Sequence, residues 1–148
     1  MRLIVAGSRA LSRAAAWGPM VEAIQEALKL QVPGSSPLEL VSGLAGVDPA
    51  TLKPKGANAG VDAYGVEWAQ HWKVPIKPFP VTEADWAARG NAAGPIRNEA
   101  MAKYAAADPT GKGALVLVWD GKSSGSGWMR RSARVEGLLI VERVVRAP

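Results

Sequence analysis

Glycine, serine and charged side chains follow several short apolar runs of this chain, and their types and spacing could support chemistry. The segments concerned are Gly7-Ser8-Arg9, Ser42-Gly43, residues 84–98 and residues 120–127. Successive backbone N–H groups in glycine-rich turns form concave sites for anions. Arg9 and Arg97 could each hold a phosphate or carboxylate through two parallel hydrogen bonds. We therefore expect these segments to bind a small anionic ligand with a planar or sugar part.

Each of these segments also has an ordinary structural explanation. Glycines such as Gly7 and Gly43 are typical of turns that follow strands. Asp120, at the end of an apolar run, is typical of a turn or helix cap. None of the segments matches GxGxxG, and residues 120–127 lack the first glycine of a Walker A loop. The expectation of a ligand site depends on all four segments meeting at one edge of a sheet.

The residue types needed for several kinds of catalysis are scarce. The chain contains no cysteine and a single histidine, His71, which excludes disulfides, thiolate metal sites and a cysteine nucleophile. One histidine also makes a histidine zinc site or a Ser-His-Asp triad very hard to build. We expect neither a metal nor a cofactor. If the protein is an enzyme, Asp120 and Asp62 are the leading acid–base candidates.

Apolar periodicity predicts alternating strands and helices along the chain. Strands are expected at residues 2–6, 38–42, 74–79, 114–119 and 138–145, and helices at 17–30, 61–72, 95–107 and 126–136. Residues 44–59 have no periodicity and are read as a loop insertion. Residues 80–94 are also expected to form a loop, in which Trp86 could stack on a base. Of two near repeats, LAGVD at 44–48 and NAGVD at 58–62, we expect the second to open the following helix.

The alternation of strands and helices predicts one domain over residues 1–148, an α/β three-layer sandwich with a mostly parallel sheet of about five strands. Residues 114–119 are the most hydrophobic strand and are expected at its centre, whereas the prolines of residues 74–79 favour an edge. In such sheets the ligand binds at the carboxyl ends of the strands. Gly7-Ser8-Arg9, Ser42-Gly43 and residues 84–98 and 120–127 come after the carboxyl ends of the predicted strands.

The charge is modestly basic and is concentrated near the C-terminus. The chain has 18 Lys and Arg against 13 Asp and Glu, a net charge of +5, and residues 122–146 carry most of this excess. A basic segment is compatible with a phosphate ligand, with nucleic acid or with an acidic protein face, but equally with a solubilising surface. Because no run approaches the length of a membrane span, we expect no membrane partner and a cytoplasmic location.

Six short motifs of this chain, taken in order, resemble those of a known family. They are GSR (7–9), VSG (41–43), AGVDAYGVEWA (59–69), ADW (84–86), AGPIRNEAM (93–101) and WDGKSSGS (119–126). Over nearly the whole chain they resemble the YspA-like, cpYpsA-related branch of the SLOG superfamily. The resemblance implies a Rossmann-like fold that binds nucleotides or nucleotide-derived ligands, such as ADP-ribose derivatives. Many members of the superfamily self-associate, so a homo-oligomer is possible.

The resemblance also implies which residues contact the ligand, and it shows two departures. The implied contacts are Gly7, Ser8, Arg9, Ser42, Gly43, Arg97, Asn98, Asp120, Gly121, Ser123, Gly125 and Ser126. The insertion at 44–59 could cover or reshape the pocket. The related phosphoribohydrolases carry a glutamate three residues after their Gly-Thr, and here Met129 stands at that spacing.

Three functions therefore stay open. The first is the sensing or sequestering of a nucleotide-derived ligand without turnover, which the missing glutamate favours. The second is a hydrolase that cleaves an N-glycosidic or phosphoribosyl bond, for which Asp62, Asp85 or Asp120 would have to supply the carboxylate. The third is the binding of single-stranded nucleic acid through the basic segment 122–146.

Overall fold

Five parallel strands form one sheet in the computed structural model, which describes residues 1–31, 37–111 and 113–146. The strand order is β3-β2-β1-β4-β5, and every neighbouring pair is parallel. The strands are β1 (Arg2–Gly7), β2 (Glu39–Ser42), β3 (Ile76–Pro78), β4 (Ala114–Trp119) and β5 (Leu139–Val144). The predicted Rossmann-like α/β sandwich is confirmed. The sheet is entirely parallel, β3 lies at an edge as expected, and β1 rather than β4 is the middle strand.

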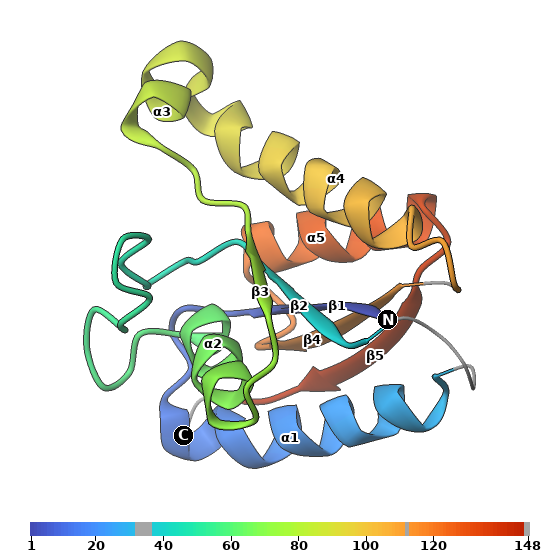
Figure 1. Cartoon of the computed structure of the whole chain (residues 1–148). Helices are drawn as coiled ribbons and strands as arrows, with labels where there is room; N and C mark the ends of the chain where they lie inside the picture. The colour runs from blue at the N-terminus through green and yellow to red at the C-terminus, as the bar shows by residue number, and fades with distance from the viewer. Residues whose placement is uncertain (32–36, 112, 147–148) are drawn as a thin grey trace.

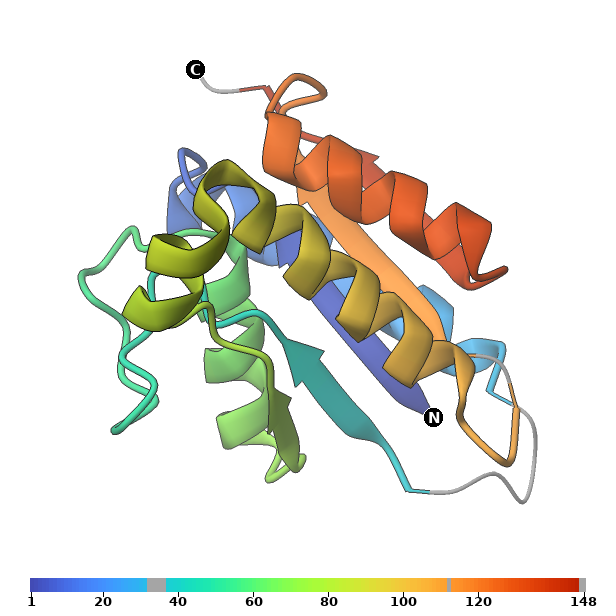
Figure 2. The ribbon, with the colours of Figure 1, turned by 90° about the horizontal axis from the view of Figure 1, so that it is seen from above.

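Helices cover both faces of the sheet (Figures 1 and 2). They are α1 (Arg13–Lys29), α2 (Val61–His71), α3 (Glu83–Arg89), α4 (Ala93–Ala106) and α5 (Ser124–Val135), with a short 3-10 turn, η1 (Gly90–Ala92), between α3 and α4. Helices α1 and α2 pack on one face, and α4 and α5 on the other. Helix α3 lies beyond the start of α4, away from the sheet (Figure 1).

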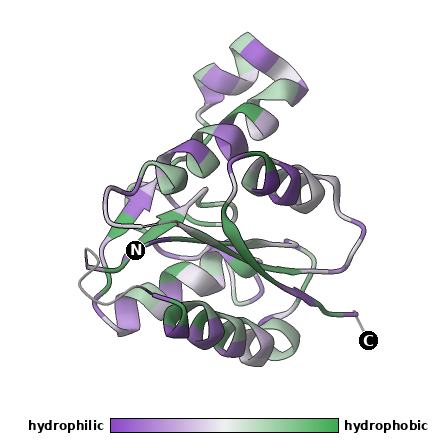
Figure 3. Cartoon of the chain, turned by 90° about the vertical axis from the view of Figure 1, so that its right-hand side faces the viewer, coloured by the Kyte–Doolittle hydropathy of each residue, from purple (hydrophilic) through white to green (hydrophobic). Residues whose placement is uncertain are grey.

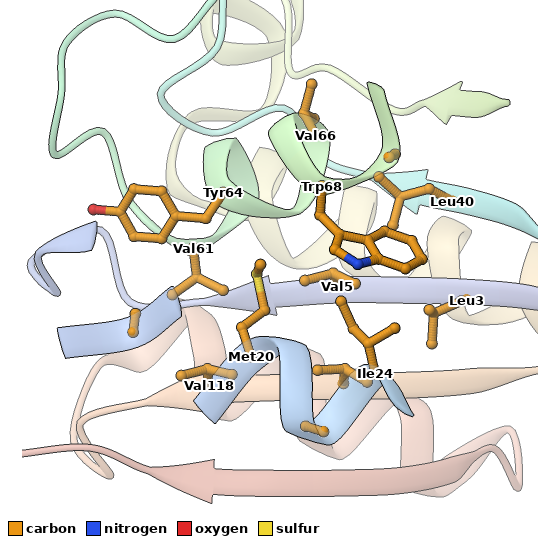
Figure 4. Close-up of a cluster of buried hydrophobic side chains, with 14 of the residues drawn as sticks. Leu3, Val5, Met20, Ile24, Leu40, Val61, Tyr64, Val66, Trp68 and Val118 are labelled. Atoms are coloured by element: carbon orange, nitrogen blue, oxygen red, sulfur yellow. The ribbon is translucent and has the colours of Figure 1, made fainter. Parts of the chain in front are cut away.

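The two faces of β1 contribute to two separate cores because side chains alternate along a strand. Leu3 and Val5 point to the α1 and α2 side, where Figure 4 shows them near Met20 and Ile24 of α1. Ile4 points to the α4 and α5 side. Burial on both faces explains why the strands are continuous apolar runs, and Figure 3 shows the sheet as a mostly hydrophobic layer between amphipathic helices.

The two largest differences from the predicted elements have local reasons, whereas α4 and α5 each begin only two residues before their predicted starts. Helix α1 begins at Arg13, not at residue 17, because the side chain of Ser12 caps it by accepting a hydrogen bond from the Ala15 N–H. Pro19 lies inside this helix, where the preceding Gly18 has no Cβ to collide with the proline ring. Residues 80–94 are not a loop. They contain α3, which Thr82 opens with a capping box.

The two ends of the insertion at 44–59 are packed against the body, whereas residues 49–58 are mostly exposed and project from it (Figures 1 and 2). Leu44 and Val47 are buried in the α1 and α2 core, and Val47 forms an antiparallel bridge with Pro54. A Cβ on Gly46, whose φ is +74°, would overlap the carbonyl oxygen of Ala59. The two near repeats thus meet at the base of the insertion, and the second one opens α2 as predicted.

Gly7, the last residue of β1, pairs with Val118 of β4. A Cβ at position 7 would overlap the Val118 carbonyl oxygen and press on Val61. We predict that Gly7→Ala lowers the free energy of unfolding by about 2–4 kcal/mol, since backbone cannot move aside as a flexible side chain can. Urea unfolding measures the change.

Gly127 of α5 provides the matched control. A Cβ there makes only an ordinary contact with Trp119 at 3.9 Å, so Gly127→Ala should raise the unfolding free energy by about 0.5–1 kcal/mol through its helix propensity. Equal stability changes for the two variants would contradict the steric account of Gly7.

Candidate ligand-binding site

A pocket of about 400 Å³ lies at the carboxyl ends of β1 and β4, bordered by the N-terminal parts of α2, α4 and α5. It brings together residues from segments that are far apart in the sequence. The predicted site residues that line it are Gly7, Ser8, Arg9, Asp62, Arg97, Asn98, Asp120, Ser123, Gly125 and Ser126. All four chemistry-bearing segments were expected to meet at one edge of the sheet. Three of them line this pocket, whereas Ser42-Gly43 lies beside it and contacts Arg97 through the Gly43 carbonyl.

A network of hydroxyl groups ties the end of β1 to the end of β4. The Ser8 hydroxyl is 2.8 Å from the Ser123 hydroxyl and accepts a hydrogen bond from the Asp120 N–H at 3.1 Å. The Ser8 N–H donates to the Val118 carbonyl. Ser8 is buried, so this network holds the floor of the pocket in place.

Asp120 organises the turn that leads into α5. Its Oδ1 accepts hydrogen bonds from the backbone N–H groups of Lys122 and Ser123, at 2.8 and 2.9 Å, and from the Ser123 hydroxyl. The two backbone bonds lower the pKa of Asp120 to about 2. Asp120 is therefore ionised at neutral pH, where it can accept hydrogen bonds but cannot donate a proton.

Arg97 and Asn98 connect α4 to two neighbouring loops. Arg97 Nη1 donates to the Gly43 carbonyl at 2.8 Å, and Arg97 Nε donates to Asn98 Oδ1 at 2.9 Å. Asn98 Nδ2 in turn donates to the Gly125 carbonyl at 3.3 Å. A Cβ at Gly43 would lie 2.5 Å from Arg97 Nη1, so glycine is needed there for the guanidinium to reach the backbone.

Asp62 is a buried carboxyl group in the first turn of α2. Its Oδ2 accepts a hydrogen bond from the Ala45 N–H at 3.3 Å. Burial raises the pKa of Asp62, and the charge of Arg97 and the N–H groups of Ala45 and Gly7 oppose this only in part. Asp62 thus differs from Asp120, because its surroundings favour the protonated form.

Four predicted contact residues lie outside the pocket lining. Ser42 is buried and accepts the Leu44 N–H through its hydroxyl. Gly43 takes part through its carbonyl bond from Arg97, and Gly121 forms the turn after β4 with a φ of +80°. Trp86 does not lie in a loop above the pocket; it is on α3 and half exposed, because the Thr82 capping box turns its segment into a helix.

Several residues of the pocket wall were not predicted. Met101 and Met129 form an apolar part of the wall, and Ala45 brings the insertion against the pocket. Both methionines are buried. In the sequence, a methionine at helical spacing predicts an ordinary core residue. No sequence signal distinguishes a core position from a pocket wall when the side chain serves both.

The basic segment 122–146 is partly neutralised by acidic neighbours. Arg130 pairs with Glu142 at 3.0 Å, and Arg143 pairs with Glu26 and with Glu22 of α1. The guanidinium of Arg131 stacks over Trp128 at 5.4 Å. The segment therefore has fewer free cations than its composition suggests.

The opposite environments of Asp62 and Asp120 predict opposite effects of pH on stability. Because its pKa is raised, Asp62 in the folded protein binds its proton more tightly than in the unfolded chain. Its contribution to stability is complete below the unfolded carboxyl pKa of about 3.9 and is lost as the pH rises through the folded pKa. Asp62→Asn should therefore become more stable relative to the wild type as the pH increases from about 4 to about 8.

Asp120→Asn is the matched control. The lowered pKa of Asp120 contributes stability above a pH of about 4, and this is lost only as the pH falls toward about 2. Asp120→Asn should be less stable than the wild type by a constant amount between about pH 5 and about pH 8. Urea unfolding across the pH range measures both, and a flat profile for Asp62→Asn would refute the account of its environment.

Among the residues that the structure describes, no group of three or more His, Asp or Glu side chains could hold a metal ion. No helix in the same residues has the length and apolar character needed to cross a membrane. Compared with known proteins, the chain matches no family model, no curated protein and no solved structure.

Proposed function

We propose that the protein binds a nucleotide-derived small ligand, such as an ADP-ribose-type molecule, in the pocket at the carboxyl ends of β1 and β4. The observation that carries the proposal is the convergence of Arg9, Arg97 and the N-terminus of α5 on one cavity of about 400 Å³, a size within the usual range for ligand sites. Sensing or sequestering of such a ligand is the function that this arrangement supports best.

The positive groups of the pocket suit a phosphate. Arg9 is exposed and has no hydrogen bond or ion pair to the described residues. Arg97 uses two of its five N–H donors on Gly43 and Asn98, which leaves donors for a ligand. Helix α5 has no acidic residue in its first turn, so the positive end of its dipole is also suited to an anion.

The remaining groups suit the sugar and base of a nucleotide. Asp120 uses only Oδ1 for the turn, so its Oδ2 can accept a hydrogen bond from a sugar hydroxyl. Met101 and Met129 offer polarisable apolar surface to a planar ring. Anion donors, a hydroxyl acceptor and an apolar wall in one pocket favour a nucleotide over a simple phosphate.

One observation favours the alternative of a hydrolase. Asp62 lies in the pocket wall, and burial raises its pKa, which is the property of a carboxyl group that donates a proton to a leaving group. Asp120, with a pKa of about 2, does not have this property. The hydrolase alternative therefore depends on Asp62 as the proton donor. Ionised Asp120 is the carboxylate in the pocket that would take the place of the glutamate of the related enzymes, whose position Met129 occupies, whereas Asp85 caps α3 and does not line the pocket.

The alternative of nucleic-acid binding through residues 122–146 has less support. The ion pairs of Arg130 and Arg143 neutralise part of the charge that would contact a phosphate backbone. Lys122, Arg131, Arg134 and Arg146 are exposed and would have to supply the contacts.

Thermal unfolding with AMP, ADP, NAD, ADP-ribose, cyclic ADP-ribose isomers and a short single-stranded oligonucleotide tests the proposal. A ligand at about one hundred times its Kd adds about 2.7 kcal/mol of stability, which raises Tm by roughly 5–10 °C for a chain of this size. We expect such a shift with one nucleotide, recovered chemically unchanged. A shift only with the oligonucleotide, lost as salt increases, would contradict the proposal.

Variants of Arg9 and Asp62 separate binding from turnover. Arg9→Gln should weaken nucleotide binding about tenfold, the loss of one charge-assisted hydrogen bond. Arg131→Gln removes an exposed arginine outside the pocket and should leave binding unchanged. If chromatography of the recovered ligand shows cleavage that Asp62→Asn abolishes, the hydrolase alternative replaces the binding proposal.

A further inference from the structure

Helices α1 and α2 border a second cavity, of about 520 Å³, on the face of the sheet that they cover. Trp17, Val21 and Leu28 line it from α1, where their spacing places them on one side of the helix. Trp68 and Trp72 line it from the C-terminal end of α2. We call the cavity bounded by these five residues the α1–α2 groove.

The α1–α2 groove is separate from the candidate ligand-binding pocket. No described residue lines both cavities. Leu38 and Val74, which come just before β2 and β3, also line the groove, so it lies toward the amino ends of these strands. The pocket lies at the carboxyl ends of β1 and β4. An occupant of the groove would therefore be distinct from the nucleotide proposed above.

The indole N–H of Trp68 is an unused hydrogen-bond donor in this groove. Trp68 is only 7% exposed, yet its indole nitrogen makes no hydrogen bond to any residue that the structure describes, whereas Trp119 Nε1 donates to Glu142 at 2.7 Å. Among those residues no fully buried side-chain nitrogen lacks a partner. The Trp68 nitrogen must therefore open onto accessible space, and the α1–α2 groove is the cavity that Trp68 lines.

This donor favours an occupant that carries a hydrogen-bond acceptor. Figure 4 shows the Trp68 indole extending from α2 toward the side of α1, where the surrounding side chains are mostly apolar. A polar group in such surroundings costs free energy when it is left unpaired. An acceptor placed in the groove would remove that cost.

The other polar groups that line the groove are uncharged amide and imidazole groups. Gln25 and His71 are exposed, and their side chains make no hydrogen bond to the described residues. No Asp, Glu, Lys or Arg among the described residues lines the groove. Arg13, which stacks on Trp17 at 4.2 Å, is paired with Glu67. A charged ligand would lose its hydration there without gaining an ion pair, so the groove favours a neutral molecule.

The size of the groove favours a small molecule over a protein partner. Nine residues line it, three of them tryptophans, whereas a stable protein–protein contact involves about 20–30 residues on each partner. A cavity of about 150 Å³ holds benzene, so a groove of about 520 Å³ has room for two or three fused rings. The faces of the indole rings stack favourably on other flat rings.

We propose that the α1–α2 groove binds a neutral, planar aromatic molecule of two or three fused rings, with an acceptor that the Trp68 indole N–H reaches. The rings lie against the indoles of Trp17 and Trp72. Gln25 and His71 hold polar atoms at the outer edge of the ligand. This site is independent of the nucleotide pocket, and it stands or falls separately from it.

Coumarin is a suitable probe, because it is neutral, has two fused rings and carries a lactone carbonyl. We expect it to shift the indole N–H resonance of Trp68, with a Kd on the order of 1 mM or tighter, as for other ligands of this size. An NMR titration of the isotope-labelled full chain measures this, and the resonance is identified by its absence from Trp68→Phe. The anion of coumarin carboxylic acid should bind at least about tenfold more weakly.

Variants of the groove test its separate parts. Trp68→Phe keeps an aromatic ring but removes the N–H, so it should bind coumarin about five- to tenfold more weakly, as followed at the backbone N–H of Val74. Trp72→Ala removes an indole that is 63% exposed, so the fold should tolerate it, and coumarin binding should weaken at least about fivefold. Trp128→Ala is the matched control. It removes a tryptophan of α5 that is 47% exposed and outside the groove, and it should leave coumarin binding unchanged.

Four results would overturn the proposal. The first is that about 5 mM coumarin shifts no resonance of the groove, and the second is that Trp72→Ala binds coumarin as tightly as the wild type. The third is that the carboxylate binds as well as coumarin. The fourth is a Trp68 N–H resonance that moves with protein concentration alone, because a second copy of the chain would then cover the groove.

Discussion

The pocket depends on the close approach of β1 and β4 at their carboxyl ends, where Gly7 leaves no room for a side chain against the Val118 carbonyl. This approach brings Ser8 within reach of Asp120 and Ser123, and the resulting hydrogen bonds hold the turn into α5. Because parallel strands all end at the same edge of a sheet, one tight pairing positions the loops of both strands.

The polar residues of the pocket are of two kinds. Some hold the loops in place, and others face the cavity with unused hydrogen-bond donors or acceptors. Ser8, Asn98 and Asp120 Oδ1 mostly stabilise the surrounding backbone. Arg9, the remaining donors of Arg97 and Asp120 Oδ2 are available to a ligand. Asp62 holds the insertion through the Ala45 N–H and also lines the cavity, but unlike the others it is buried so that its pKa is raised. The turn after β4 is therefore held by hydrogen bonds within the protein.

The two predicted elements that differ most from the structure do so where side-chain capping outweighs apolar periodicity. Strands β1 and β4 and helix α2 were predicted almost to the residue, since long apolar runs and a clear helical face leave little choice. Helix α1 starts four residues early because of Ser12, and α3 exists because of Thr82 and Asp85. Both caps were present in the sequence, but short polar segments rich in alanine and glycine do not show periodicity.

The sequence by itself determined the class of fold, the parallel sheet and most of the residues at the edge where the pocket lies, because β1, β2 and β4 are apolar runs that end in or are followed by glycine or a polar residue. Only the tertiary structure decided what those residues do. It placed Asp62 in a buried site and Asp120 in a web of backbone N–H groups, so that two aspartates of equal sequence character have pKa values shifted in opposite directions. Trp86, which was predicted to contact the ligand, lies outside the pocket. Its place is set by the packing of α3 against α4, which the sequence of α3 alone does not determine.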